Sequence, residues 1–204
     1  MKKIINYKNL IVNPENYRFD PVDNQEEAID LMIKEKGKEI FNLAKHIIEN
    51  GLDAAKDFRV LEAGKGNYIV LDGNRRATAI KCLHDPSLIK EPRLQKAFRD
   101  LTEGKNFKDE ISCFVYTSEQ DAAKWIKLDH TVKNEGVGQD SWGAPEVDRF
   151  SYKFEGKISP AMQIVSMVEE GAGIKVDTSR LKVSTINRIL SNPESRSMLG
   201  VDIK

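Results

Sequence analysis

The stretch "LDGNRRATA", residues 71–79, places two adjacent arginines directly behind a glycine. It continues the apolar run "NYIVL", residues 67–71, whose β-branched and aromatic side chains are typical of a buried strand. From Asn74 to about Leu83 the apolar residues recur at helical spacing, and asparagine is a common helix cap. The stretch therefore predicts a junction between a strand and a helix, with Asn74 as the cap.

Strands and helices alternate around this junction. The segment 2–12 is strand-like, "ISCFVY" at 111–116 is a further strand, and the glycine-bearing turn 64–67 joins two strands into a hairpin. Helices are predicted over residues 26–36, 38–50, 74–83, 94–101 and 118–129. The pattern indicates a mixed α/β fold, of the kind also called α+β, with a small sheet.

Beyond Trp142 the pattern contains helices alone. They are predicted over residues 145–154, 159–170 and 184–191, followed by a short helix that begins at Asn192-Pro193. We therefore expect an α/β domain over residues 1–142 and an all-helical extension over residues 143–204. One hypothesis is that the native chain continues beyond Lys204.

Composition narrows the class of protein. Lys plus Arg and Asp plus Glu both total 32 in 204 residues, so no whole-chain basic field attracts nucleic acid. No apolar run approaches the roughly 20 residues that span a bilayer, and no signal-like apolar region follows the start. Cys82 and Cys113 are too few for a disulfide framework. A cytoplasmic protein without membrane association is expected.

The junction has the chemistry of an anion site. A helix start exposes unpaired N–H groups and the positive end of the helix dipole. Gly73 allows a ligand to approach the backbone, and Arg75 and Arg76 supply cationic forks suited to phosphate oxygens. The alternative is a structural ion pair between Asp72 and one of the arginines. The residues alone leave both readings open.

The order of motifs resembles the N-terminal domain of the ParB/sulfiredoxin superfamily. That order is "NPENYR" at 13–18, an amphipathic helix ending in glycine, the hairpin 58–73, and the box "GNRRATA". In ParB-type proteins a Gly-x-Arg-Arg-x-x-Ala box holds the phosphates of a nucleotide, CTP in the chromosome-partition members. The resemblance covers about residues 4–142. It implies a nucleotide site at Arg18, Asp72, Gly73, Asn74, Arg75 and Arg76.

A second box of the family departs from the pattern here. A Glu-Asn-x-x-Arg box normally reaches the triphosphate and its magnesium, and this chain has Asp129-His130-Thr131-Val132-Lys133 at that place. The resemblance implies Asp129 as a Mg²⁺ ligand, Asp129 and His130 as catalytic candidates, and Lys133 as a phosphate contact. Unlike asparagine, His130 can titrate or act as a base. Alternatively, His130 and Lys133 only end their helix favourably.

Two branches of the superfamily and one domain type are disfavoured. The sulfiredoxin cysteine would fall at Asn74, which cannot form a thiolate, so the chain is not a sulfiredoxin. The free-serine kinase branch carries histidines where Asn74 and Arg75 stand. A helix-turn-helix follows in ParB proteins, but the separation of Gly171 and Ser184 is too long for its usual turn. A packed helical appendage is therefore favoured over a DNA reader.

The sequence leads to three hypotheses of function. The first is a nucleotide-dependent switch or weak nucleotidase that takes CTP or ATP with Mg²⁺, in a DNA-associated bacterial, plasmid or phage protein. The second is a ParB-like metal-dependent nuclease that uses Asp129 and His130. The third is a catalytically inert DNA or protein interaction module. Nucleotide is the expected partner, and DNA and a second copy of the chain are further candidates.

Overall fold

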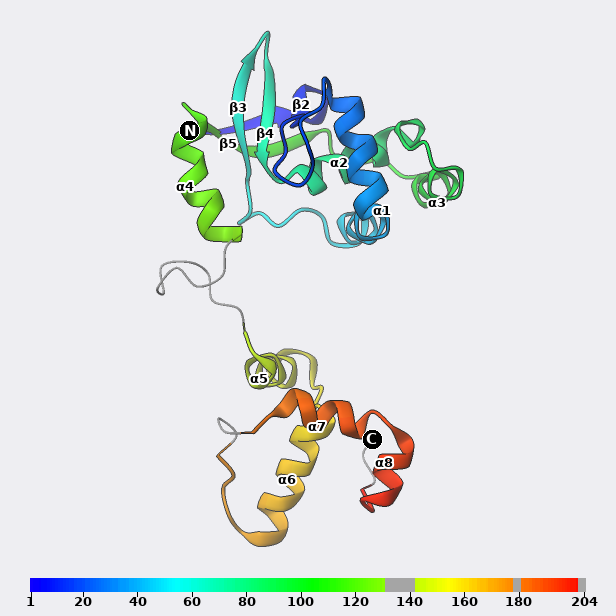
Figure 1. Cartoon of the computed structure of the whole chain (residues 1–204), viewed down its shortest axis with the longest axis vertical. Helices are drawn as coiled ribbons and strands as arrows, with labels where there is room; N and C mark the ends of the chain where they lie inside the picture. The colour runs from blue at the N-terminus through cyan, green and yellow to red at the C-terminus, as the bar shows by residue number, and fades with distance from the viewer. Residues whose placement is uncertain (131–141, 178–180, 202–204) are drawn as a thin grey trace. The chain divides into compact units, whose positions relative to one another are not determined.

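The computed structural model describes residues 1–130, 142–177 and 181–201. The chain divides into two compact units, Met1–Asn134 and Glu135–Lys204. Figure 1 shows the sheet in the first unit and helices alone in the second. Each unit is described by itself below.

The first unit contains a five-stranded mixed sheet with the order β1-β5-β3-β4-β2. Its strands are β1 (Lys2–Asn6), β2 (Leu10–Val12), β3 (Phe58–Gly64), β4 (Asn67–Asp72) and β5 (Glu110–Tyr116). The pairs β1–β5 and β3–β4 are antiparallel, whereas β3–β5 and β2–β4 are parallel. The predicted α/β class and the hairpin are confirmed.

The strand-like segment 2–12 forms two strands rather than one. The short 3-10 helix η1 (Tyr7–Asn9) separates them, and β1 and β2 lie at opposite edges of the sheet. Because β2 pairs with β4, the chain that follows β2 begins next to the strand that leads into the junction. This placement brings the start of the loop 13–24 to the start of the helix that follows β4, where Asn13 contacts Asn74.

The predicted helices of the first unit are confirmed. They are α1 (Gln25–Asn50), α2 (Asn74–His84), α3 (Pro92–Thr102) and α4 (Glu119–His130). A short 3-10 helix that was not predicted, η2 (Pro86–Leu88), follows α2. The two helices expected over 26–50 form one element with a non-helical backbone at Lys36. Gly51 ends it with φ 76°, a conformation that favours glycine.

The main core lies between α1, α2 and one face of the sheet. Buried side chains there include Ile40 on α1, Ile80 on α2, and Phe58, Val60 and Val70 on the strands. On the other face, Ala122 and Ile126 of α4 pack against Leu71 in a smaller cluster. Figure 1 shows α4 on one side of β3 and β4, with α1 and α2 on the other side.

The second unit consists of helices. These are α5 (Ala144–Glu155), α6 (Pro160–Ala172), α7 (Val183–Leu190) and α8 (Pro193–Met198). The side chains of Ala161, Val165, Val183 and Leu190 are buried between α6 and α7 and their neighbours. Asn192 caps α8 as the sequence predicts. Among the described residues, no helix has the length and apolar character needed to span a membrane.

Candidate anion-binding site at the start of helix α2

Strand β4 passes into α2 through a single residue. Gly73 has φ 104° and is the N-cap of the helix, and no side chain among the described residues caps this end. The prediction that Asn74 is the cap is therefore wrong, since Asn74 is the first residue inside the helix. The first N–H groups of α2, which lack partners within the helix, remain available to an external acceptor.

Asn74 holds the junction together instead. Its side chain is only 5% exposed. The Oδ1 atom accepts a hydrogen bond of 2.9 Å from the backbone N–H of Asn13, and Nδ2 donates one of 2.9 Å to the carbonyl of Val70. The side chain thus ties the loop 13–24 to β4 and does not face a ligand. A tertiary contact therefore decides its role, since Asn13 is 61 residues away in the sequence.

The structure explains why position 73 is a glycine. A Cβ atom at this position would lie 2.8 Å from Phe58 Cδ1 and 3.1 Å from Arg76 Nη2. The positive φ also disfavours other residues. The glycine is therefore required by the turn and by the packing on Phe58, independently of any ligand.

The two arginines take different directions. The Arg76 guanidinium lies 4.5 Å above the Phe58 ring and donates a hydrogen bond to the carbonyl of Lys56. Burial lowers the pKa of Arg76. Arg75 is exposed, and its side chain makes no hydrogen bond or ion pair with any described residue. Of the predicted pair, Arg75 is the one free to contact a ligand.

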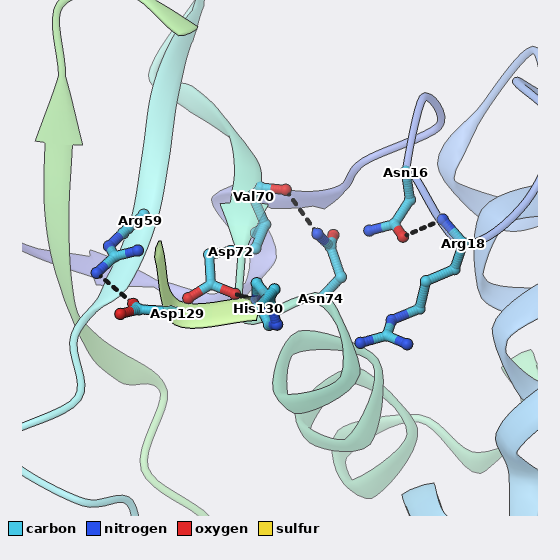
Figure 2. A network of polar contacts seen from close by, with 8 residues as sticks. All are labelled: Asn16, Arg18, Arg59, Val70, Asp72, Asn74, Asp129 and His130. Carbon is cyan, nitrogen blue, oxygen red and sulfur yellow. Dashed lines mark hydrogen bonds and ion pairs between the residues drawn. The ribbon is translucent and has the colours of Figure 1, made fainter. Parts of the chain in front are cut away.

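The loop 13–24 stands beside this helix start. Asn13 and Asn16 each accept a hydrogen bond from the backbone two residues on, at 2.9 Å and 3.1 Å. Such turns fix the loop locally. They present Arg18, which is exposed, and Figure 2 shows its side chain pointing toward the first turn of α2. Tyr17 also donates a hydrogen bond of 3.1 Å to Glu119 at the start of α4.

The last turn of α4 meets the ends of two strands. His130 Nε2 lies 3.0 Å from Asp72 Oδ1, and Asp129 Oδ2 lies 2.6 Å from Arg59 Nη2 (Figure 2). Asp72 therefore pairs with His130 and not with Arg75 or Arg76. The direct ion pair considered from the sequence is not formed, although the Asp72 carboxylate acts on Arg76 electrostatically from beyond ion-pair distance.

Arg59 is a residue that the sequence reasoning missed. It lies in β3 between the buried Phe58 and Val60, so its side chain points to the opposite face, where α4 packs. An arginine at the alternate position of an otherwise apolar strand is a signal for such a contact. Its pairing with Asp129 could not be predicted without knowing where α4 lies.

The predicted magnesium site finds few donors. Among the described residues, no group of three or more His, Cys, Asp and Glu side chains is arranged to hold a metal ion. Asp129, the predicted ligand, already has the Arg59 partner. The described donors do not fit a resident Mg²⁺ ion, and no step is derived through one. Lys133 lies outside the described residues, so its predicted phosphate contact stays a prediction.

A large cavity of the first unit lies elsewhere. It has a volume of about 1380 Å³, and none of the predicted site residues lines it. Its wall includes Lys56 and Phe58, the residues that Arg76 contacts, so Arg76 borders it from outside. The start of α2 is thus a surface site, and this cavity belongs to another part of the unit.

Similarity to known proteins is found among solved structures alone. No protein-family model matches the chain, and no curated protein matches it. Among solved structures, the chain is similar to the C-terminally truncated chromosome-partitioning protein ParB from Caulobacter crescentus, complexed with CTP-gamma-S. The identity is 16%, the match covers 98% of this chain and 86% of that chain, and the TM-score is 0.40.

Proposed function

We propose that the first unit binds a nucleoside triphosphate, such as CTP or ATP, through its phosphates at the start of α2. The observation that carries this proposal is the open first turn of the helix. No described side chain caps it, while an unpaired arginine, Arg75, stands on that same turn. An anion is the ligand that both features favour.

The expected contacts follow from position. The backbone N–H groups of the first turn would donate to phosphate oxygens, and the helix dipole would add to the attraction. Arg75 would contribute charge-assisted hydrogen bonds. Arg18 would approach from the loop 13–24, and Arg76, held against Phe58, would add charge at longer range.

Without a bound anion, the positive charge of Arg75 lies at the positive end of the α2 dipole, which is unfavourable. An arginine in the first turn opposes the helix dipole by a few tenths of a kcal/mol at an exposed position, about 0.3–1 kcal/mol. In the absence of an acidic cap, nothing on the turn itself offsets this term. A bound polyphosphate would reverse its sign.

A role as a nucleotide-dependent switch, with weak hydrolysis, is the function we favour for this site. His130 contacts Asp72, the residue directly before Gly73, so the last turn of α4 lies next to the proposed phosphates. A ligand bound at Gly73 would therefore alter the contact between His130 and Asp72. DNA association and a second copy of the chain as partner remain parts of the proposal that rest on the family resemblance.

The nuclease alternative has less support. It requires Asp129 and His130 to be available to metal and substrate, and each already contacts a strand residue. No observation on the described residues favours it, and the inert interaction module is the outcome if no nucleotide binds.

The experiment is a thermal-shift panel of CTP, ATP, GTP and inorganic triphosphate, each with and without Mg²⁺. Binding at about 100 times Kd stabilises a protein by about 2.7 kcal/mol. For a chain of this size the rise in Tm is then roughly 5–10 °C. The double variant Arg75→Ala/Arg76→Ala is expected to lose the rise, and Arg75→Ala alone to lose most of it.

Two results would contradict the proposal. One is the absence of a rise in Tm with every ligand for the folded wild-type protein. The other is an unchanged rise in Arg75→Ala. A rise with inorganic triphosphate alone would retain the phosphate site and remove the nucleoside from the proposal.

A further inference from the structure

Tyr17 stands in the loop 13–24 with its aromatic ring in solvent. It is 75% exposed, more than any other aromatic residue that the structure describes. Aromatic side chains are the surfaces on which proteins stack nucleobases, because every base has a flat π-face. The ring thus offers a stacking surface in the loop whose first residue contacts the start of α2.

A turn anchored on both sides presents this ring. The Asn16 carbonyl accepts a hydrogen bond of 3.2 Å from the backbone N–H of Phe19, which closes the turn 16–19. Asn16 is buried, and Phe19 packs against the main core. Tyr17 and Arg18 are therefore the two central residues of the turn, and both are exposed at its tip.

The hydroxyl end of the ring is tethered to α4. The Tyr17 hydroxyl donates a hydrogen bond of 3.1 Å to Glu119 Oε1, and Glu119 lies in the first turn of α4. The ring is thus held at its backbone and at its hydroxyl group, while most of its surface is open to solvent. A ligand that stacks on a ring already held in place loses less conformational entropy on binding.

Charge divides the surface around this turn. On the side of α2, the exposed Arg18 and Arg75 favour phosphate, and Figure 2 shows the Arg18 side chain pointing toward the first turn of that helix. Around Tyr17, the carboxylates of Glu119 and Glu15 act electrostatically on its hydroxyl group. A phosphate is repelled by these carboxylates, whereas an uncharged base is not. The arrangement fits a molecule with an anionic end and a neutral aromatic end.

The two ends are close enough for one small molecule. The backbone N–H of Asn13 donates a hydrogen bond to Asn74 at the start of α2, and Tyr17 is four residues further along the chain. Four residues span at most roughly 14 Å when fully extended. Since a nucleoside triphosphate carries its phosphates and its base at opposite ends, a single molecule can contact both the helix start and the ring.

We propose that the Tyr17 ring stacks on the base of a nucleotide whose phosphates bind at the start of α2. This contact rests on the proposed function and gives the site a residue that recognises the nucleoside. Stacking distinguishes a nucleotide from a bare polyphosphate, and it accepts purines and pyrimidines alike. Glu119 acts as a positioning residue, because it holds the ring through the hydroxyl group.

The test is calorimetric titration of the full chain with ATP, CTP and inorganic triphosphate, in wild type, Tyr17→Ala and Tyr17→Phe. Tyr17→Ala removes the stacking surface, so its affinity for ATP and CTP should fall at least about fivefold. Its affinity for inorganic triphosphate should stay like that of wild type. Tyr17→Phe retains the ring and loses the hydrogen bond with Glu119, so it should bind both nucleotides more tightly than Tyr17→Ala does.

Proton NMR reads the stacking itself. The base protons of ATP should shift upfield on binding to wild type and to Tyr17→Phe, because they enter the shielding region above an aromatic ring, and should not do so with Tyr17→Ala. Tyr152→Ala is the matched control, since it removes another exposed tyrosine, from α5 in the second unit. It should leave the affinities for all three ligands unchanged.

The possible failures are distinguishable. The stacking contact is overturned if Tyr17→Ala binds ATP and CTP like wild type, or if it loses affinity for inorganic triphosphate to the same extent. It is also overturned if Tyr17→Phe and Tyr17→Ala lose equal affinity, since the hydrogen bond with Glu119 and not the ring is then responsible. Absence of binding of all three ligands to wild type would instead contradict the phosphate site, and the stacking contact with it.

Discussion

Helices α2 and α3 are of equal length and begin in opposite ways. Each has 11 residues and carries an exposed arginine at its second position, Arg75 in α2 and Arg93 in α3. At the start of α3 the Glu91 carboxylate accepts hydrogen bonds from the backbone N–H groups of Arg93 and Leu94, at 3.0 Å and 2.6 Å. At the start of α2 no described side chain does so.

The two helix starts differ in whether the protein itself supplies a negatively charged acceptor. In α3 the protein supplies its own carboxylate, which satisfies two donors and complements the dipole. In α2 the corresponding residue is Gly73, which leaves the same donors open, and no acidic residue stands in the first turn beside the arginine. The comparison of α2 with α3 therefore illustrates the proposed function. A phosphate bound at α2 would accept hydrogen bonds from the first backbone N–H groups, as the Glu91 carboxylate does at α3.

Gly73→Ala is expected to have the largest effect. Strain in a left-handed conformation and overlap with Phe58 together cost roughly 2–5 kcal/mol of unfolding free energy. Gly104→Ala is the matched control just beyond α3, since it has φ 69° but open space around the added Cβ. Urea unfolding of both variants measures the difference. Equal losses would show that packing on Phe58 does not hold the junction.

Asn74→Ala should follow in magnitude. It leaves the N–H of Asn13 and the carbonyl of Val70 without this partner, and because water can enter the vacated space the total cost is about 1–3 kcal/mol. Asn74→Asp retains an acceptor for Asn13 but loses the donor to Val70, so chemical denaturation of the two variants separates the bonds. A loss below that of an ordinary surface substitution would contradict the role of Asn74 in fixing the loop 13–24.

Glu91→Ala tests the closed helix start directly. Loss of the cap is expected to reduce the free energy of unfolding by about 1 kcal/mol. Opening α3 in this way should not create a triphosphate-dependent rise in Tm, because Lys90, the cation directly before Glu91, is already paired with Asp30. A nucleotide response at α3 after this change would mean that any open helix start with an arginine suffices.

Arg75→Ala in the absence of ligand is expected to have the smallest effect. The side chain makes no hydrogen bond or ion pair with a described residue, and its charge opposes the dipole, so stability should change by no more than about 0.5 kcal/mol. Thermal unfolding without nucleotide measures this. A large loss would assign Arg75 a structural role and weaken its role as a ligand contact.

Local patterns predicted the elements but not the contacts at the site. The strand before Gly73, the helix after it and the hairpin turn 64–67 followed from periodicity and from turn residues. The roles of Asn74 and Arg76 did not, because their partners Asn13 and Lys56 are far away in sequence. Where β2 pairs with β4, the loop 13–24 reaches Asn74, and that pairing was not visible in the pattern of residues 2–12.

The last two residues of α4 give a second example of contacts that the sequence did not predict. Asp129 and His130 were singled out from a family motif, yet their observed partners are Arg59 and Asp72. Sequence could identify residue types suited to phosphate or metal, but it could not show which of them the sheet would engage. The unengaged residue, Arg75, became distinct from Arg76 only in the structure.

The central claim is that the open start of α2, and not a general positive charge, holds the phosphates. Calorimetric titration of CTP, ATP or inorganic triphosphate, using the ligand that gives the largest thermal shift, tests it in Arg75→Ala and Arg93→Ala. Both variants remove one exposed arginine from the second position of a helix. Arg75→Ala is predicted to weaken binding at least about tenfold, whereas Arg93→Ala binds like wild type. Equal affinities in the two variants would contradict the account.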